Sequence, residues 1–94
     1  MTKVLLRLYV AGTSATSRQA ERNFARLLSL VGSECRTEIV DVVARPDMAE
    51  SAGILATPTL SFEHPVRPRR VIGDLSNPQK VIEFLGIRPK DDRT

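Results

Sequence analysis

Apolar residues along this chain follow two alternating periods. Residues 3–11 are apolar at almost every position, which predicts a strand inside a sheet. A stretch rich in Gly, Ser and Thr at 12–17 interrupts the pattern, and apolar residues then recur at helical spacing over 20–31. We expect Gly32 to end that helix. The β-branched run at 38–43 predicts a second strand, so the first half of the chain reads as strand, helix, strand.

The middle of the chain has weaker local signals. A short helix is predicted over 46–53, with a proline at its first position and a glycine at its end. Arg45 is a poor N-cap and a helix of this length is marginal alone, so contacts with the rest of the protein must hold it. Pro58 cannot donate a hydrogen bond to a sheet, and we expect it at the start of a third strand.

The last third of the chain predicts a hairpin and a final helix. After a proline-containing turn, residues 69–72 return antiparallel to the third strand. Ser76 is the expected N-cap of the final helix, whose apolar positions include Phe84 and which ends at Gly86. The predicted order is βαβαββα, which is the thioredoxin-like α/β arrangement of a mixed sheet flanked by helices.

Length and composition limit the classes of function. With 94 residues the chain suits one small domain, which we expect over 1–87 with a solvated tail over 88–94. It has 14 basic and 11 acidic residues, and its cations are mostly arginine, which favours an acidic protein partner. One tyrosine, three phenylalanines and no tryptophan argue against nucleic-acid binding. No apolar run approaches the ~20 residues of a membrane span, so we expect no membrane segment and a cytoplasmic protein.

Reactive side chains are few. Cys35 is the only cysteine and His64 the only histidine, so the usual ligands for a disulfide or a metal site are missing. In thioredoxin-like redox proteins the reactive thiols stand at the start of the first helix, whose dipole lowers their pKa. Ser14 and Ser17 stand there in this chain. They either cap the helix or donate a hydrogen bond to a thiolate, as in a glutathione-dependent enzyme, and both interpretations stay open.

Four motifs carry a resemblance to a known family. They are LYVAG at 8–12, IVDV at 39–42, ILATPTL at 54–60 and RRVIGDLS at 69–76. In this order and spacing they resemble the KaiB family of clock proteins, over almost the whole chain. The KaiB-like sensor domain of the SasA histidine kinase is the nearest alternative.

The resemblance implies a regulatory protein that is not an enzyme and needs no cofactor. Such a protein binds the KaiC hexamer, an ATPase and autokinase, and modulates its phosphorylation cycle; KaiA or a SasA-type histidine kinase is a further partner. KaiB proteins also exchange the thioredoxin-like form for a form with a rearranged C-terminal half. A resting homo-oligomer, tetramer or dimer, with that rearranged fold is therefore the alternative to a thioredoxin-like monomer.

Two sets of residues are candidates for contacts with a partner. The first set stands where the family presents basic or polar side chains, and the resemblance implies that it contacts KaiC: Arg7, Tyr9, Arg69 and Arg70. The second set forms one basic ridge at helical spacing: Arg18, Arg22 and Arg26. The ridge is either a second interface or a solvated helix face.

The resemblance further implies a region where the fold switches. It comprises Gly53, Ala56, Thr57, Pro58, Gly73 and Asp74. In the thioredoxin-like form we expect the Thr57–Pro58 peptide bond to be cis. Glu38 and Gly53 stand where the family commonly has lysine. The helical spacing of the last apolar residues favours the thioredoxin-like form as the resting state.

Overall fold

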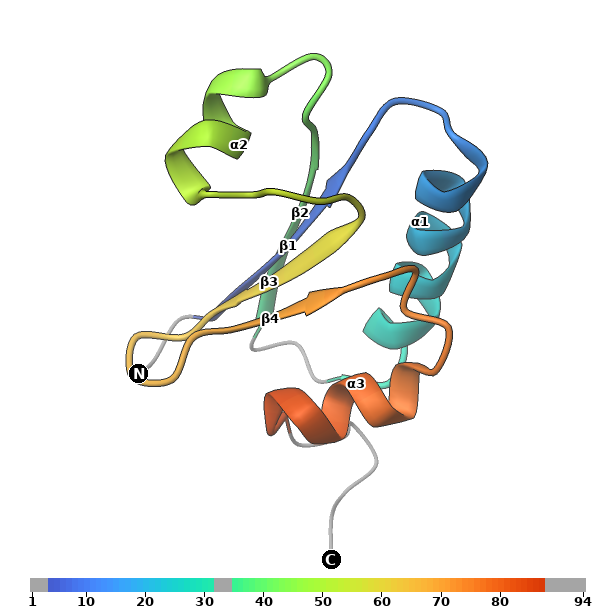
Figure 1. The fold of residues 1–94 in the computed structure, drawn as a ribbon. Coiled ribbons are helices and arrows are strands. Elements are labelled where there is room, and N and C mark those ends of the chain that lie inside the picture. The colour runs from blue at the N-terminus through green and yellow to red at the C-terminus, as the bar shows by residue number, and fades with distance from the viewer. Residues whose placement is uncertain (1–3, 32–34, 88–94) are drawn as a thin grey trace, which may run out of the picture.

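The computed structural model describes residues 4–31 and 35–87, so the predicted tail and Gly32 lie outside the described residues. Three helices and four strands follow one another in the predicted order within these ranges. Their bounds are β1 Val4–Val10, α1 Ala15–Leu28, β2 Cys35–Asp41, α2 Pro46–Ala52, β3 Thr59–Glu63, β4 Arg69–Ile72 and α3 Pro78–Leu85 (Figure 1).

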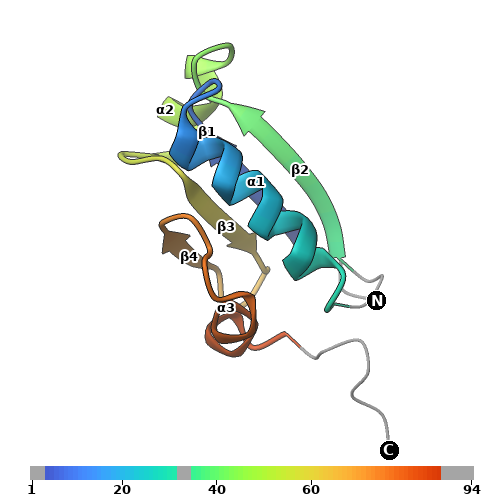
Figure 2. The same ribbon diagram turned by 90° about the vertical axis from the view of Figure 1, so that its right-hand side faces the viewer.

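The strands form one mixed sheet in the order β2-β1-β3-β4. β1 pairs in parallel with β2 and antiparallel with β3, and β3 pairs antiparallel with β4. α1 and α3 cover one face of the sheet, whereas α2 lies beyond the other face (Figures 1 and 2). This confirms the thioredoxin-like arrangement, and the rearranged alternative is not the fold that the structure has. None of the helices in the described ranges is long and apolar enough to cross a membrane.

The hydrophobic core lies between the sheet and the two helices α1 and α3. Alternate strand positions point to the same face, so every second residue of a strand enters this core. The buried core residues are Leu6, Leu8, Val10, Ala20, Phe24, Leu27, Val31, Leu60, Phe62, Leu75, Val81, Ile82 and Leu85. The residues between them on the strands face the side of α2, and Arg7, Tyr9 and Arg70 are among them.

Helix α1 ends earlier than predicted. Its last residue is Leu28 and its C-cap is Ser29. The backbone N–H of Ser29 donates to the carbonyls of Ala25, Arg26 and Leu27. The Ser29 hydroxyl also donates to the Arg26 carbonyl at 2.6 Å, and Leu30 N–H turns back to Leu27 at 2.9 Å. These local bonds replace the next helical turn. Val31 is still buried, but as part of a bridge rather than of the helix.

Strand β2 begins and ends earlier than the predicted 38–43. It starts at Cys35 because its backbone pairs with β1 from Val4 onward, although the side chains of residues 36–39 are exposed. It ends at Asp41, whose Oδ1 accepts hydrogen bonds from the backbone N–H groups of Val43 at 3.0 Å and Gly12 at 2.9 Å. An aspartate that bonds the backbone two residues ahead favours a turn.

The N-cap of helix α3 is Asn77 rather than the predicted Ser76. The Asn77 side chain accepts from Lys80 N–H at 3.2 Å and so caps the helix, while Pro78 occupies its first turn. The helix ends at Gly86, as predicted, in a left-handed conformation. Phe84 was predicted among the apolar helix positions, but its side chain is half exposed and faces away from the core.

Candidate partner-binding surface

The sheet presents a charged face on the side opposite α1 and α3. Strand register places Glu38, Arg7, Ser61 and Arg70 in one row that crosses all four strands. The row beside it holds Val40, Tyr9, Thr59 and Ile72. Two predicted contacts, Arg7 and Arg70, therefore share one face, separated by a single strand.

Arg7 stands at the centre of an ion-pair network. Its Nε donates to Glu38 at 2.6 Å, and its Nη1 approaches both Glu63 and the Tyr9 hydroxyl at 3.4 Å. Ser61 donates to the same Glu63 carboxylate at 3.2 Å. The hydrogen bond to Tyr9 and the two carboxylates hold the pKa of Arg7 above its ordinary value, against the effect of burial. The guanidinium is always charged, and its charge is matched within the protein.

Tyr9 is not a surface residue in this structure. Its side chain is 0% exposed, so in this form of the protein the ring offers no surface to a partner. The reason is its position: Leu8 and Val10 on either side point into the core, so Tyr9 faces the side on which α2 lies (Figure 1). Its ring supports that side of the sheet, and its hydroxyl meets Arg7.

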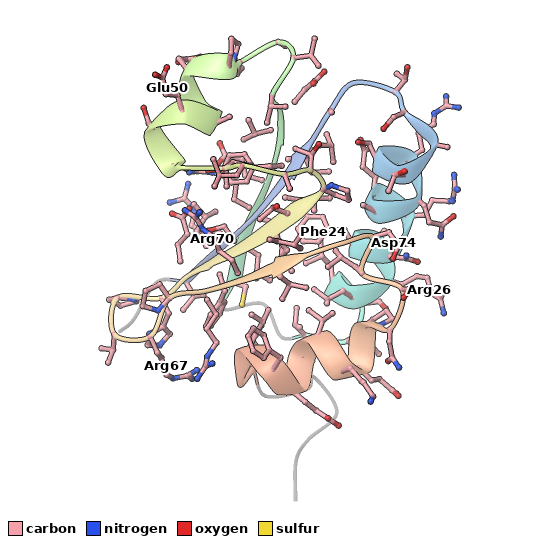
Figure 3. All side chains as sticks on the ribbon, viewed as in Figure 1. Phe24, Arg26, Glu50, Arg67, Arg70 and Asp74 are labelled. Carbon is pink, nitrogen blue, oxygen red and sulfur yellow. The ribbon has the colours of Figure 1, made fainter. Side chains whose placement is uncertain are left out.

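Arg70 reaches from β4 to the end of α2. Its guanidinium donates to the carbonyl oxygens of Ala52 and Gly53, the last helical residue and the C-cap (Figure 3). The carbonyls at a helix C-terminus lack helical donors and carry partial negative charge, which suits an arginine. The predicted partner contact is thus also an internal support for α2.

Arg69 lies on the other face of the sheet from Arg70. It pairs in register with Phe62, a core residue, and its guanidinium stacks over the Phe84 ring at 5.2 Å. Arg67 donates to the carbonyls of Leu85 at 3.0 Å and Gly86 at 3.4 Å. The half-exposed ring of Phe84 is therefore covered by the Arg69 guanidinium, a cation–π contact that helical spacing did not predict.

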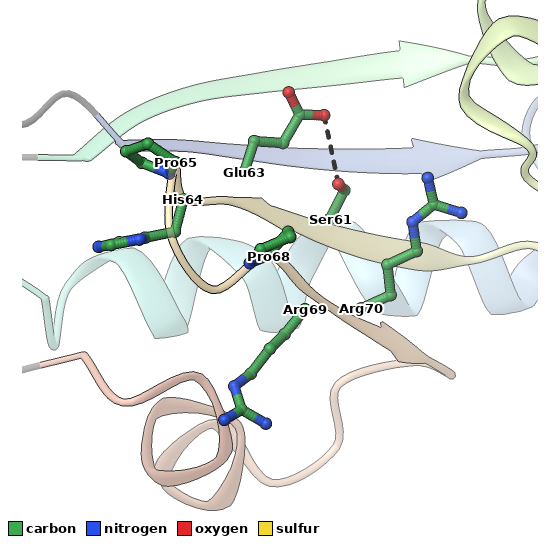
Figure 4. Close-up of a pocket in the computed structure, with 7 residues that line it drawn as sticks. All are labelled: Ser61, Glu63, His64, Pro65, Pro68, Arg69 and Arg70. Atoms are coloured by element: carbon green, nitrogen blue, oxygen red, sulfur yellow. Dashed lines mark hydrogen bonds between the residues drawn. The ribbon is translucent and has the colours of Figure 1, made fainter.

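An open hollow of about 650 Å³ lies on the β3–β4 hairpin (Figure 4). Its lining residues are Ser61, Glu63, His64, Pro65, Pro68, Arg69 and Arg70. His64 Nδ1 accepts from the backbone N–H groups of Val66 and Arg67, so the imidazole holds the turn together. No group of three or more potential metal ligands occurs within residues 4–31 and 35–87.

The basic ridge lies on a different side of the molecule. Arg18, Arg22 and Arg26 are all exposed on α1, and Arg22 donates to Gln19 at 2.7 Å. The buried stripe of α1 faces the sheet, so the ridge points away from it. The structure therefore divides the predicted contacts among three places: the charged sheet face, the α3 side of the hairpin and the outer face of α1.

The predicted switch residues lie close to one another where β3 begins and β4 ends. The Thr57–Pro58 peptide bond is cis, as expected for this form of the fold. The Pro58 carbonyl accepts from Gly73 N–H at 2.9 Å, and the Thr59 hydroxyl donates to Ala56 at 2.6 Å. The carbonyl of Asp74 accepts from the buried Asn23 side chain of α1 at 2.7 Å. Gly53 joins this region through Arg70.

The two serines at the start of α1 both serve the backbone. Ser14 is the N-cap and its hydroxyl oxygen accepts from Ser17 N–H at 3.2 Å. The Ser17 oxygen accepts from Ala11 N–H at 2.9 Å, and its side chain is buried. Of the two interpretations, capping is the one that the structure has. Asp41 bonds the backbone of Gly12 beside them, a contact that the sequence pattern of its strand does not indicate.

Three comparisons place the chain among known proteins. The KaiB domain profile matches residues 7–87. Circadian clock protein KaiB3 of Synechocystis sp. is 41% identical over 91 residues, covering 96% of this chain and 89% of that protein. Circadian clock oscillator protein KaiB of Thermostichus vulcanus is 38% identical over 96 residues, covering 94% and 89%.

Solved thioredoxin structures are similar in fold. Mitochondrial thioredoxin 3 of Saccharomyces cerevisiae has a TM-score of 0.74 at 18% identity, covering 92% of this chain and 79% of that chain. Plasmodium falciparum thioredoxin has a TM-score of 0.75 at 16% identity, covering 96% and 76%. Because their sequence identity is below 20%, these likenesses show the fold alone. The clock relatives are 41% and 38% identical over nearly all of this chain, and the domain profile matches residues 7–87. The chain therefore belongs to the KaiB family.

Proposed function

We propose that this protein is a clock-type regulator, without enzymatic activity, that binds the KaiC hexamer and modulates its phosphorylation cycle. The observation that carries the proposal is the family match over residues 7–87, with relatives that are named clock proteins. We place the protein in the cytoplasm, with KaiA or a SasA-type histidine kinase as a further partner. A homo-oligomer at rest is part of the same proposal.

The start of α1 supports a binding role over redox or glutathione chemistry. The only cysteine of the chain is Cys35 on β2, at a distance in sequence from the helix start where thioredoxin thiols act. The Ser17 oxygen is buried and accepts from Ala11 N–H, so it is not presented to a substrate. A glutathione-dependent enzyme would need a free polar group at this position.

Exposure and charge suggest which residues meet KaiC. Arg69 and Arg70 are exposed on the hairpin, and Arg18 and Arg22 are exposed on α1. None of these four has a carboxylate partner within the described part of the chain. Arg7 is less suited, since two carboxylates already pair with it. A fold switch during binding is supported by the weak attachment of α2.

Size-exclusion chromatography with light scattering tests the proposal. The protein is run alone and after hours with the KaiC hexamer of the same genome and ATP, in both phosphorylation states of KaiC. A shift into a ring-sized complex supports KaiC binding, and slow formation from an oligomer supports fold switching. The double variant Arg18→Glu, Arg22→Glu tests whether the α1 ridge contacts KaiC. Arg69→Glu tests the same for the hairpin.

The absence of any shift with either KaiC state would contradict the proposal. Competition by a SasA-type domain for the same complex tests the further partner. Activity with glutathione and an electrophile is measured in parallel, and turnover there would favour the enzyme instead.

A further inference from the structure

Helix α2 is held to the rest of the protein mainly at its C-terminal end. None of its residues is buried, and its N-cap Arg45 makes no side-chain cap. Its last carbonyls, Ala52 and Gly53, both accept from the Arg70 guanidinium. A helix of seven residues is not stable by itself, so a few contacts decide whether it stays in place.

The side of the sheet that faces α2 carries a row of buried residues. Val40, Tyr9 and Thr59 form a row that register places across β2, β1 and β3, and all three are buried. Leu8 and Val10 alternate with Tyr9 and enter the core under α1. The row therefore faces away from α1 and α3, toward α2 and the segment that follows it (Figures 1 and 2).

The arginines of the hairpin interact with neutral groups. Arg70 bonds peptide carbonyls, Arg67 bonds the carbonyls at the end of α3, and Arg69 stacks on an aromatic ring. Within residues 4–31 and 35–87, none of the three forms an ion pair. A carboxylate bonds a guanidinium through two parallel hydrogen bonds and is a stronger partner than a neutral carbonyl.

The hairpin also offers a place for an extended chain. β4 is the last strand in the sheet order, so its outer edge has no neighbouring strand within the described residues. Exposed edge strands pair with added segments, and side chains then select the partner. Three arginines between positions 67 and 70 select an acidic segment.

We propose that Arg70 is a clamp that holds α2 over the sheet, and that an extended acidic segment of a partner protein docking along β4 releases it. The partner carboxylate takes the guanidinium from Ala52 and Gly53, α2 moves away, and Tyr9 becomes accessible. This inference goes beyond the proposed function and does not require KaiC, so its tests use this protein without KaiC.

Hydrogen exchange of residues 46–53 measures the clamp directly. We expect Arg70→Gln to speed the exchange of these amides about three- to tenfold, since it removes charge-assisted hydrogen bonds at an exposed site, while α1 amides stay protected. Arg69→Gln is the matched control, because it removes the neighbouring cation, which contacts Phe84 and not α2. Equal exchange over 46–53 in the Arg70→Gln variant and the unchanged protein would overturn the proposal.

Tyr9 provides a second measurement. It is the only tyrosine of a chain that has no tryptophan, so fluorescence excited near 280 nm comes from this ring alone. We expect acrylamide to quench it more strongly in Arg70→Gln than in Arg69→Gln. If Arg70→Gln loses α1 protection as well, Arg70→Lys replaces it, because lysine keeps the charge but not the two-pronged geometry. Unchanged exchange and quenching in Arg70→Lys would then contradict the clamp.

The partner chemistry is tested with hexaglutamate at constant ionic strength. We expect it to increase exchange over 46–53 and Tyr9 quenching in a saturable way, and to have no such effect on Arg70→Gln. Hexaserine is the neutral control, and a uridine hexanucleotide supplies negative charge of another class. No response to hexaglutamate, or an equal response to the nucleotide, would overturn the assignment of an acidic protein segment.

Discussion

Helices α2 and α3 share a common plan but differ in what holds them. Each begins with a proline at Pro46 or Pro78, and each ends at a glycine in the left-handed conformation, with φ of 69° at Gly53 and 74° at Gly86. An arginine from the β3–β4 hairpin region bonds the final carbonyls of each helix. The terminal chemistry of the two helices is therefore nearly the same.

Burial separates them. α3 buries Pro78, Val81, Ile82 and Leu85, and its Asn77 cap bonds the first turn. α2 buries none of its residues and begins without a side-chain cap. Most helical stability in proteins comes from packing of an apolar face rather than from ends. The same terminal residues therefore occur in one helix that packs on the core and in another that is held mainly at its C-terminal end.

Truncation of an apolar side chain should separate the helices most strongly. Leu85→Ala removes a fully buried side chain from α3, and we expect it to lower the free energy of unfolding by about 3 kcal/mol. Met48→Ala is the matched change in α2, where the side chain is only partly buried, and should cost less than about 1 kcal/mol. Urea denaturation followed by circular dichroism measures both. Equal losses would mean that α2 is packed as firmly as α3.

The two terminal glycines should respond differently to alanine. Gly53→Ala meets no atom within 4 Å and should cost about 1 kcal/mol, the usual penalty of a left-handed conformation. At Gly86 an added Cβ would lie 2.7 Å from Nη1 of Arg67, so Gly86→Ala should cost about 2 kcal/mol. The two losses are compared from the midpoints of urea denaturation, provided that the dependence of the unfolding free energy on urea concentration is unchanged. A smaller loss at Gly86 would show that Arg67 moves aside freely.

The N-caps provide a third contrast. Asn77→Ala removes the side-chain acceptor for Lys80 N–H, and we expect a loss of about 1 kcal/mol. Arg45→Ala removes a side chain that caps nothing at the start of α2, and the unfolding free energy should stay within experimental error. Thermal unfolding of both variants measures these changes in stability. A clear loss for Arg45→Ala would reveal a role of this residue beyond its exposed pair with Asp47.

Acid should loosen the turn between β2 and α2 and leave the start of α3 unaffected. Hydrogen bonds from Gly12 and Val43 lower the pKa of Asp41, and Arg45 lowers that of Asp47, both from the ordinary value of 3.8. A lowered folded-state pKa gives stability that is present above the ordinary value and is lost as pH falls through the folded value. The Asn77 cap of α3 does not titrate.

A proton–nitrogen NMR titration from pH 6 to pH 2 measures this effect. The amides of Gly12 and Val43 should shift below about pH 4, whereas that of Lys80 should not. Asp41→Asn keeps an acceptor oxygen without a titrating group, and should abolish the shift at Gly12. A persistent shift there would assign the titration to another carboxyl group.

The sequence predicted the elements whose side chains decide their structure. The apolar spacing of Phe24 and Leu27 placed α1 against the sheet, and Pro58 marked the start of β3. Gly53 and Gly86 ended their helices as expected. In each case a steric or solvent preference of the residue itself determines the local conformation.

The misplaced bounds arise from backbone pairing and competing local bonds. Arg36 and Thr37 are exposed and polar and lay outside the predicted strand, yet β2 includes them because β1 pairs with their backbone. Ser29 and Asp41 ended α1 and β2 through side-chain bonds to nearby backbone groups. Asn77 and Ser76 are both good N-caps, and the sequence alone does not rank them.

The candidate surface was predicted in composition but not in geometry. Arginine content indicated an acidic partner, and the charged residues of the hairpin and α1 are exposed. Alternation along β4 puts Arg69 and Arg70 on opposite faces. The register between β1 and β2 brings Glu38 to Arg7, across 31 residues of sequence. The bonds from Arg70 to the end of α2 depend on where α2 packs, which no local pattern contains.

The serine pair at the start of α1 separates this chain chemically from redox proteins of the same fold. Ser14 and Ser17 have the three-residue separation of a Cys-x-x-Cys dithiol. Their oxygens accept hydrogen bonds from Ser17 N–H and Ala11 N–H, and sulfur is a weak acceptor. Exchanging oxygen for sulfur at these positions would leave two backbone donors poorly paired. The changes Ser14→Cys and Ser17→Cys would therefore restore the dithiol spacing and at the same time weaken two hydrogen bonds at the start of α1.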